Sequence, residues 1–297
     1  MAKTRDIVIG IIIAGVCCLF FLMVIVSFIG ISRGDGFSLS SGGDKVAIVE
    51  ISGVISDSED IIAQLKKYEK DKSIKAVVIR IDSPGGQVAP TQEIYEQILK
   101  LKESGIPVIV SIASIAASGG YYIACAADTI LANPGSLTGS IGAIIDFYTF
   151  EGLMGKVGMQ HEVVKSGELK DVGNLARSMT EKERAMMQAA INDVYNQFVE
   201  AISESRNMEI SQVEEIADGS IFTGNQALEL GLVDKLGGLE DAISLAGKMS
   251  GLGDHPKVVR QYSKRPRLID YLTEQAQRFL GIQSTTDVGP SFKYIFR

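Results

Sequence analysis

A single serine, Ser118, stands among small residues in the stretch SIAASGGYYIACAAD, which runs from Ser114 to Asp128. Glycine and alanine leave the backbone accessible, so a ligand could approach it closely and meet the Ser118 hydroxyl. Small residues also allow a helix to pack tightly against a sheet, and Ser118 would then serve only as the N-cap of that helix. The residue types are consistent with both interpretations, a nucleophile and a helix cap.

A second glycine-rich turn, SPGG, covers residues 83–86 and follows a predicted strand, as the turn at Ser118 does. In an open α/β sheet, ligands bind outside the carboxyl ends of the strands, so both turns are expected to face one crevice. Two backbone N–H groups, one from Gly85 or Gly86 and one from Gly119, would then form an oxyanion hole beside the serine. Taken alone, SPGG is also typical of a tight connection between a strand and a helix.

A serine nucleophile needs a general base, and the sequence limits the choice. The only histidines are His161, within a predicted strand, and His255, at the start of a basic tail, and neither is well placed for a triad. A lysine can act as the base when burial keeps its amine neutral. No serine is followed by a lysine three residues later, so the base must come from elsewhere in the fold. From the residues alone, Lys165 and Lys170 in KSGELK are equal candidates.

Composition and motifs exclude several other classes of protein. The chain has 297 residues and a net charge of −7, and its acidic body has no basic stripe, which argues against a nucleic-acid partner. Its three cysteines have neither a disulfide-framework pattern nor metal-ligand spacing, and no phosphate-binding G-x-x-x-x-G-K-[ST] motif occurs. We therefore expect no metal, no cofactor and no use of ATP.

The elements that must position these residues alternate between strands and helices. The sequence predicts strands over 45–55, 76–82, 107–113 and 129–135, and helices over 58–71 and 90–103. This alternation is typical of a layered α/β domain with largely parallel pairing. Further along the chain, Thr180 and Glu183 form a capping box that predicts a helix running to about Arg206.

The N-terminal region predicts a membrane anchor. Residues 7–32 form an uncharged run of 26 residues, which as a helix would span about 39 Å and cross a hydrocarbon core of about 30 Å. Lys3 and Arg5 precede the run, which predicts a cytoplasmic N-terminus and a body outside the cytoplasm, held at the inner (plasma) membrane by a single-pass helix. A cleaved signal peptide is the alternative, but its A-x-A-like cleavage site is absent.

Five motifs, in order, carry a resemblance to a known family. SPGG, AASGGYYIA, NPGSLTGSIG, KSGELKDVGN and IFTGNQALELGLVDKLGG together resemble bacterial signal peptide peptidase A in its short, single-repeat form. The resemblance covers residues 45–247 and implies a ClpP/crotonase-like fold of stacked ββα units. Together with the composition of the two ends, it predicts four parts: an N-terminal signal anchor, a Gly/Ser-rich linker, a ClpP/crotonase-like peptidase domain and a basic C-terminal tail. Their residues are 1–32, 33–44, 45–250 and 251–297.

The resemblance also implies roles for individual residues. In that family, the serine of ASGG is the nucleophile and the lysine of the G-x-x-K segment is the general base, which correspond here to Ser118 and Lys170. The serine of TGSIG, here Ser140, hydrogen-bonds and orients the lysine. The SPGG glycines, Gly85 and Gly86, correspond to the loop of the oxyanion hole.

By this resemblance, the chain is expected to be a membrane-anchored serine endopeptidase with a Ser–Lys dyad that degrades cleaved signal peptides and other short apolar peptides. Members of that family form ring- or bowl-shaped oligomers. Because this chain has one copy of each motif, we expect a homo-oligomer in which Lys170 of one subunit completes the site at Ser118 of its neighbour. The alternatives are a crotonase-like acyl-thioester enzyme and a non-catalytic scaffold on the same fold.

Overall fold

The computed structural model describes residues 43–260 and 293–296. The chain divides into two compact units, Met1–Gly43 and Asp44–Arg297, and almost everything described belongs to the second. The predicted anchor, most of the predicted linker and most of the basic tail lie outside the described residues. Within those residues, no helix combines the length and the apolar character needed to cross a bilayer.

A mostly parallel sheet forms the centre of the second unit. Its strand order is β7-β6-β4-β2-β1-β9, with β5 beside β4 and β8 beside β5. All its pairings are parallel except that of β6 with β7. The strands are β1 (Lys45–Ser52), β2 (Ile74–Ser83), β4 (Val108–Ala117), β5 (Thr129–Ala132), β6 (Leu137–Gly139), β7 (Ile221–Thr223), β8 (Lys235–Leu236) and β9 (Lys257–Arg260). The predicted α/β class with parallel pairing is confirmed.

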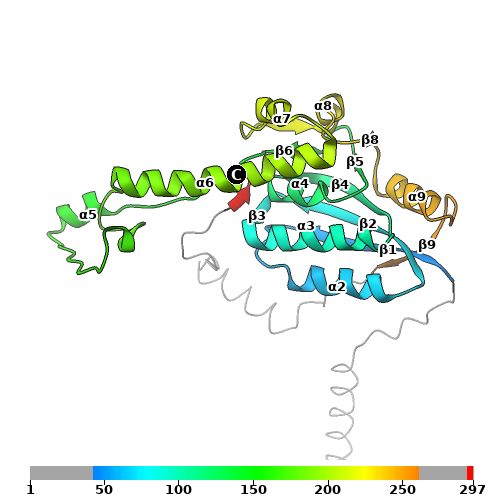
Figure 1. Cartoon of the computed structure of the whole chain (residues 1–297), viewed down its shortest axis with the longest axis horizontal. Coiled ribbons are helices and arrows are strands. Elements are labelled where there is room, and N and C mark those ends of the chain that lie inside the picture. Colours follow the sequence, from blue (N-terminus) through cyan, green and yellow to red (C-terminus); the bar gives the residue numbers. More distant parts are fainter. Residues whose placement is uncertain (1–42, 261–292, 297) are drawn as a thin grey trace, which may run out of the picture. The chain divides into compact units, whose positions relative to one another are not determined.

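Helices cover the central strands on both faces, which explains why these strands are apolar runs. Figure 1 shows α2 (Glu59–Lys70), α3 (Val88–Glu103) and α4 (Gly119–Ala124) packed side by side along the sheet. Side chains alternate along β1. Ala47 and Val49 join the larger core with those helices, and Val46 and Ile48 join a smaller core with α9 (Leu239–Met249).

The chain between β6 and α6 (Glu181–Arg206) leaves the sheet and forms an arm, defined here as residues 146–180. It contains α5 (Glu151–Lys156) and the short 3-10 helix η1 (Glu168–Asp171), and Figure 1 shows α5 at the end of α6 that lies away from the sheet. The predicted capping box at the start of α6 is confirmed. The strand predicted around His161 is wrong, because this exposed segment has no strand beside it in the described chain.

A second, smaller sheet lies beside the carboxyl ends of the central strands. It pairs β3 (Gly85–Gln87), which is part of the SPGG turn, with β10 (Lys293–Ile295), close to the end of the chain. The remaining helices, α7 (Ile210–Ile216) and α8 (Gly224–Glu229), flank β7. The sheet of β3 and β10 therefore brings the last described residues to the edge where the predicted site lies.

Candidate active site

Ser118 occupies the junction between β4 and α4 in a strained backbone conformation. Its φ is 51° and its ψ is −116°, a combination that residues other than glycine rarely adopt. Two hydrogen bonds hold it there: its N–H donates to the Gly139 carbonyl (2.7 Å), and its carbonyl accepts from the Tyr122 N–H (2.9 Å). Ser118 is the N-cap residue of α4 by position, but its hydroxyl does not cap the helix, because its side chain makes no capping hydrogen bond.

The two glycine-rich turns meet beside Ser118, as the sequence predicts. A methyl group placed on Gly85 would lie 2.8 Å from the backbone nitrogen of Gly119, and one placed on Gly119 would lie 3.3 Å from the Gly85 Cα. Gly85 also has a φ of 98°, which favours glycine. Its N–H donates to the Ser83 hydroxyl (3.1 Å), so this donor is already engaged. Gly86 follows in β3, opposite Tyr294 of β10.

The carbonyl oxygen of Tyr294 lies at the point where the two turns meet. A methyl group on Gly85 would come within 2.0 Å of this oxygen, and one on Gly119 within 3.1 Å. The structure thus places a peptide carbonyl against the glycines predicted to form the oxyanion hole. Sequence reasoning missed this contribution of β10, and the only signal available was the short apolar segment YIF (294–296) at the end of the basic tail.

Ser140 lies next to Ser118 through the backbone of β6. Gly139, which accepts the Ser118 N–H bond, directly precedes it, and Ser140 itself has a φ of 49°. Its N–H donates to the Ser220 carbonyl (2.7 Å). Within the described part of the chain, neither the Ser118 hydroxyl nor the Ser140 hydroxyl has a hydrogen-bond partner, although both residues are buried. Two unengaged hydroxyls therefore stand close to the meeting point of the turns.

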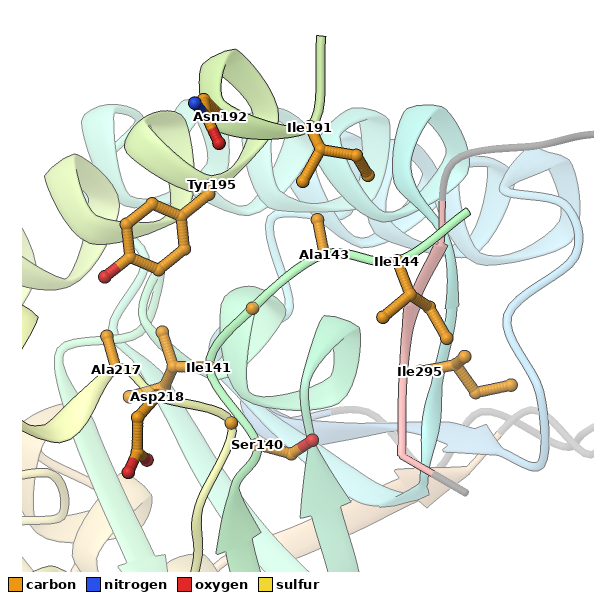
Figure 2. A pocket seen from close by; sticks show the side chains of 12 residues that line it. Ser140, Ile141, Ala143, Ile144, Ile191, Asn192, Tyr195, Ala217, Asp218 and Ile295 are labelled. Carbon is orange, nitrogen blue, oxygen red and sulfur yellow. The ribbon is translucent and has the colours of Figure 1, made fainter. Parts of the chain in front are cut away.

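A hollow of about 490 Å³ opens beside Ser140. Figure 2 shows Ser140 at its base, with side chains from α6 on one side and Ile295 of β10 at the other. Its apolar lining comes mainly from Ile141, Ala143, Ile144, Ile191, Tyr195 and Ile295. An apolar peptide side chain would lose water contact in this hollow, which favours its binding.

Lys170 is not brought to Ser118 within one chain. It lies in η1, in the arm, where its side chain is exposed. Figure 1 shows the chain between α5 and α6 far along the arm from α4. Among the described residues, the Lys170 ammonium makes no ion pair and no hydrogen bond. The predicted dyad is therefore not assembled in the single chain.

Lys165, the other candidate base, is engaged within the arm. Its ammonium pairs with the Asp171 carboxylate and donates to the Glu168 carbonyl (2.9 Å). Hydrogen bonds from Arg177, and then from Lys165, hold the pKa of Asp171 well below its usual range. The Lys165 ammonium is therefore occupied within the arm by Asp171 and Glu168.

Arg177 connects the lysine-bearing turn to the start of α6. It donates to Asp171 (2.9 Å) and to the buried Glu183 (2.8 Å). The hydrogen bond from Arg177, and then that from the backbone N–H of Thr180, lower the pKa of Glu183 to about 2. The backbone around Lys170 is therefore fixed by a charged network, while the Lys170 side chain itself is left exposed.

Neither histidine approaches this site through the elements described. His161 is exposed in the arm, and His255 is exposed between α9 and β9. Within the described residues, no cluster of three or more histidine, cysteine, aspartate or glutamate side chains is arranged to hold a metal ion.

The sequence matches two families of known proteins. It matches Peptidase family S49 over residues 100–253 and Clp protease over residues 44–135. The first match spans more than half of the chain and includes Ser118, Ser140 and Lys170. The chain belongs to peptidase family S49. It is a serine peptidase, and its parallel-rich α/β fold agrees with the Clp protease match.

Individual relatives agree with this assignment to family S49. A protein of Synechocystis named as a protease is 44% identical, over 70% of this chain and 75% of that protein. A protein of Enterococcus faecium named as a signal peptide peptidase SppA is 34% identical, over 84% of this chain and 77% of that protein. The chloroplastic serine protease SPPA of Arabidopsis thaliana is 32% identical, over 83% of this chain but only 39% of its own length.

Proposed function

We propose that this S49 peptidase is a Ser–Lys endopeptidase of the ClpP/crotonase type, with Ser118 as nucleophile and Lys170 as general base. The observation that carries the proposal is the buried, strained Ser118 at the point where two glycine turns converge on one peptide carbonyl. Strain of this kind persists only where the surrounding structure enforces it, and it gathers at catalytic sites. A purely structural serine at this position would have no need of the conformation.

Gly86 and Gly119 are the proposed donors of the oxyanion hole. The sequence left Gly85 and Gly86 as alternatives, and the Gly85 N–H is engaged by Ser83. Gly86 is the residue that stands opposite the carbonyl-bearing Tyr294 in the strand register. Gly85 then contributes by lacking a side chain, because any Cβ there would occupy the place of the bound carbonyl oxygen.

A neighbouring subunit is proposed to supply the general base. The arm exposes large apolar side chains, which include Tyr148, Phe150, Leu153, Val157, Met159 and Val164, the last of them 98% exposed. Apolar patches of this kind mark interfaces between proteins. Packing of the arm on a second copy would bury these side chains and carry Lys170 toward the unengaged hydroxyls of Ser118 and Ser140. Burial of an amine favours its neutral form, which can accept a proton.

In the proposed reaction, the neutral amine of Lys170 takes the proton from the Ser118 hydroxyl as the Ser118 Oγ attacks the substrate carbonyl carbon. The negative charge that develops on the carbonyl oxygen is stabilised by the N–H groups of Gly86 and Gly119. Lys170 then returns the proton to the leaving amine, and an ester to Ser118 remains. Water, activated by the same lysine, hydrolyses that ester. Ser140 orients the lysine amine.

The proposed substrates are short apolar peptides such as cleaved signal peptides. The apolar hollow beside Ser140 supports this choice, and the name of the Enterococcus relative points the same way. The uncharged run of residues 7–32 supports a single-pass anchor in the inner membrane, with the catalytic unit outside the cytoplasm. There the enzyme would meet peptides released into the bilayer.

Complementation between two inactive variants tests the dyad and its sharing between subunits. Ser118→Ala and Lys170→Ala chains should each be inactive. In a random equal mixture, about one site in four would combine a native serine with a native lysine from its neighbour, because each comes from the right chain half of the time. Hydrolysis of a synthetic signal peptide should therefore recover to about a quarter of the native rate.

Lys165→Ala is the matched control, since it removes a lysine five residues away that is held by Asp171. It should retain hydrolysis. Absence of recovery in mixtures that are shown to contain both chains in one oligomer would refute sharing between subunits. Activity in Lys170→Ala alone would refute the base.

A further inference from the structure

We propose that Asp82 is a positioning residue for the proposed nucleophile: its carboxylate holds a bulge in β4, and this bulge places Ser118 beside the glycine turns. The inference rests on the proposed function and deepens it. Asp82 lies in β2, directly before the SPGG turn. It acts through the backbone of β4 and not by contact with the substrate.

β4 contains a bulge shortly before Ser118. Its pairing with β2 is regular up to Ile112, which lies opposite Ile81, and it resumes at Ala116, which lies opposite Ser83. Two steps along β2 therefore correspond to four steps along β4, so β4 holds two extra residues at this place. Bulges bend a strand and change the direction of the side chains that follow, and they are common beside active sites.

The side chain of Asp82 holds this bulge. Its Oδ1 accepts hydrogen bonds from the backbone N–H groups of Ser114 and Ile115, each of 3.2 Å. The charge of the carboxylate strengthens such bonds. On its other side, the backbone carbonyl of Asp82 accepts from Gly53, which follows β1 (2.9 Å). Because Ser114 is exposed, burial of its side chain does not explain the course of the bulge. The two bonds to Asp82 do.

The bulge coincides with a change of partner along β4. Before it, residues 109–112 pair with β5, and after it, residues 115–117 pair with β6. The carbonyl of Gly139, the last residue of β6, accepts the Ser118 N–H (2.7 Å). The change of partner therefore brings Ser118 to the residue that holds its strained backbone, and Ser140 follows directly in the chain.

Hydroxyls from the β6 side bind the carbonyl groups of the same segment. Ser136 donates to the Ala113 carbonyl (2.5 Å), and Thr138 donates to the Ala116 carbonyl (2.7 Å). Asp82 supplies the complementary contact, because it binds N–H groups and ties the bulge to β2. Without its carboxylate, the bulge and the residues after it would be free to shift. A displacement of about 1 Å at a reacting group can cost about a hundredfold in rate.

Hydrolysis of a synthetic signal peptide by the full chain tests the inference. Asp82→Ala should lower kcat about a hundredfold. KM should change less than about twofold, because the groups that bind the substrate remain. Asp82→Asn keeps an oxygen with two lone pairs, which can accept both bonds but without the charge. Its kcat should recover to about threefold to tenfold below the native value.

Asp128→Ala is the matched control. The Asp128 Oδ2 accepts the backbone N–H of Val108 (2.8 Å), at the end of β4 that lies away from Ser118. Both substitutions thus remove a carboxylate that binds the backbone of the same strand. Both should lower the melting temperature, but Asp128→Ala should leave kcat unchanged. A merely structural Asp82 would affect the melting temperature alone.

Amide hydrogen exchange, resolved to single residues, adds a measurement that needs no catalysis. The Ser118 N–H bonds to Gly139 and not to Asp82, so its exchange reports whether loss of the bulge contact reaches the nucleophile. Exchange at Ser118 should be about tenfold or more faster in Asp82→Ala than in Asp128→Ala, because only the first frees the segment that leads to it.

Each outcome decides the role of Asp82. A native kcat in Asp82→Ala, or equal Ser118 exchange in the two alanine variants, would overturn the inference and leave the peptidase function standing. If Asp82→Ala does not fold, Asp82→Asn is compared with Asp128→Asn, and an equal kcat in these two would overturn it. No hydrolysis by the native chain would instead refute the proposed function, and the exchange measurement would still decide whether Asp82 positions Ser118.

Discussion

Ser118→Gly should stabilise this S49 peptidase while abolishing its proposed activity. Ser118 has φ 51° and ψ −116°, and a side chain in such a sparsely populated conformation costs on the order of 1–3 kcal/mol. Glycine adopts positive φ without this penalty. The informative comparison is with Ser118→Ala, because both variants lack the hydroxyl and only alanine retains the Cβ strain.

The expected size of the effect is a difference between two terms. Relief of strain favours glycine by about 1–3 kcal/mol, and the larger conformational entropy of glycine in the unfolded chain opposes it by about 0.5–1 kcal/mol. Ser118→Gly should therefore be at least as stable as Ser118→Ala, by up to roughly 2.5 kcal/mol. In a unit of this size, that corresponds to a rise in melting temperature of up to about 10 °C.

Calorimetric melting of the two variants measures this difference. Ser114→Gly and Ser114→Ala are the matched control, because Ser114 is an exposed residue of β4 without a positive φ. At that position, glycine should be the less stable of the two by about 0.5–1 kcal/mol. If glycine were also the less stable residue at position 118, the backbone there would not be strained, and the main structural argument for its role would fail.

Three further changes have defined outcomes. Gly86→Ala places a methyl group 2.0 Å from the Ile55 backbone oxygen. It should abolish peptide hydrolysis while the helical circular dichroism signal is retained. Gly135→Ala is the control: its methyl group meets nothing within 4 Å and should leave hydrolysis unchanged. Tyr121→Phe leaves the buried Leu232 carbonyl without its 2.7 Å bond, and urea denaturation should show a loss of about 1–3 kcal/mol. The pKa of the Glu183 carboxyl is lowered to about 2. Its ionised form therefore stabilises the fold fully above pH 4.5, and this stabilisation is lost as the pH falls toward 2. The difference in melting temperature between the native chain and Glu183→Gln should narrow over that pH range.

Short sequence patterns predicted those elements and turns of the site that are determined by residues close together in the chain. The runs of valine and isoleucine in β1, β2 and β4 predicted a parallel sheet because strands covered on both faces are apolar throughout. The capping box of Thr180 and Glu183 predicted the start of α6, because its hydrogen bonds join residues only three positions apart. The meeting of the two glycine turns followed from strand polarity alone, since parallel strands bring their carboxyl ends to one edge.

Long-range contacts account for what the sequence did not predict. The pairing of β10 with β3 joins residues about 200 positions apart, and a three-residue strand has too short a pattern to specify a partner. The strand predicted around His161 has an apolar and β-branched composition, but in the described chain it lies in the arm without a neighbouring strand. Such a composition indicates only that the side chains favour burial, and packing against a second copy of the chain can bury them as well as a neighbouring strand can.

The separation of Lys170 from Ser118 gives the proposed enzyme a built-in dependence on assembly. In one chain, the serine has its strained conformation and its glycine turns, but the lysine lies on the exposed arm. A single subunit would then lack the base. Packing of the arm on a neighbour would supply it. Dilution below the assembly concentration should therefore abolish hydrolysis without unfolding the chain.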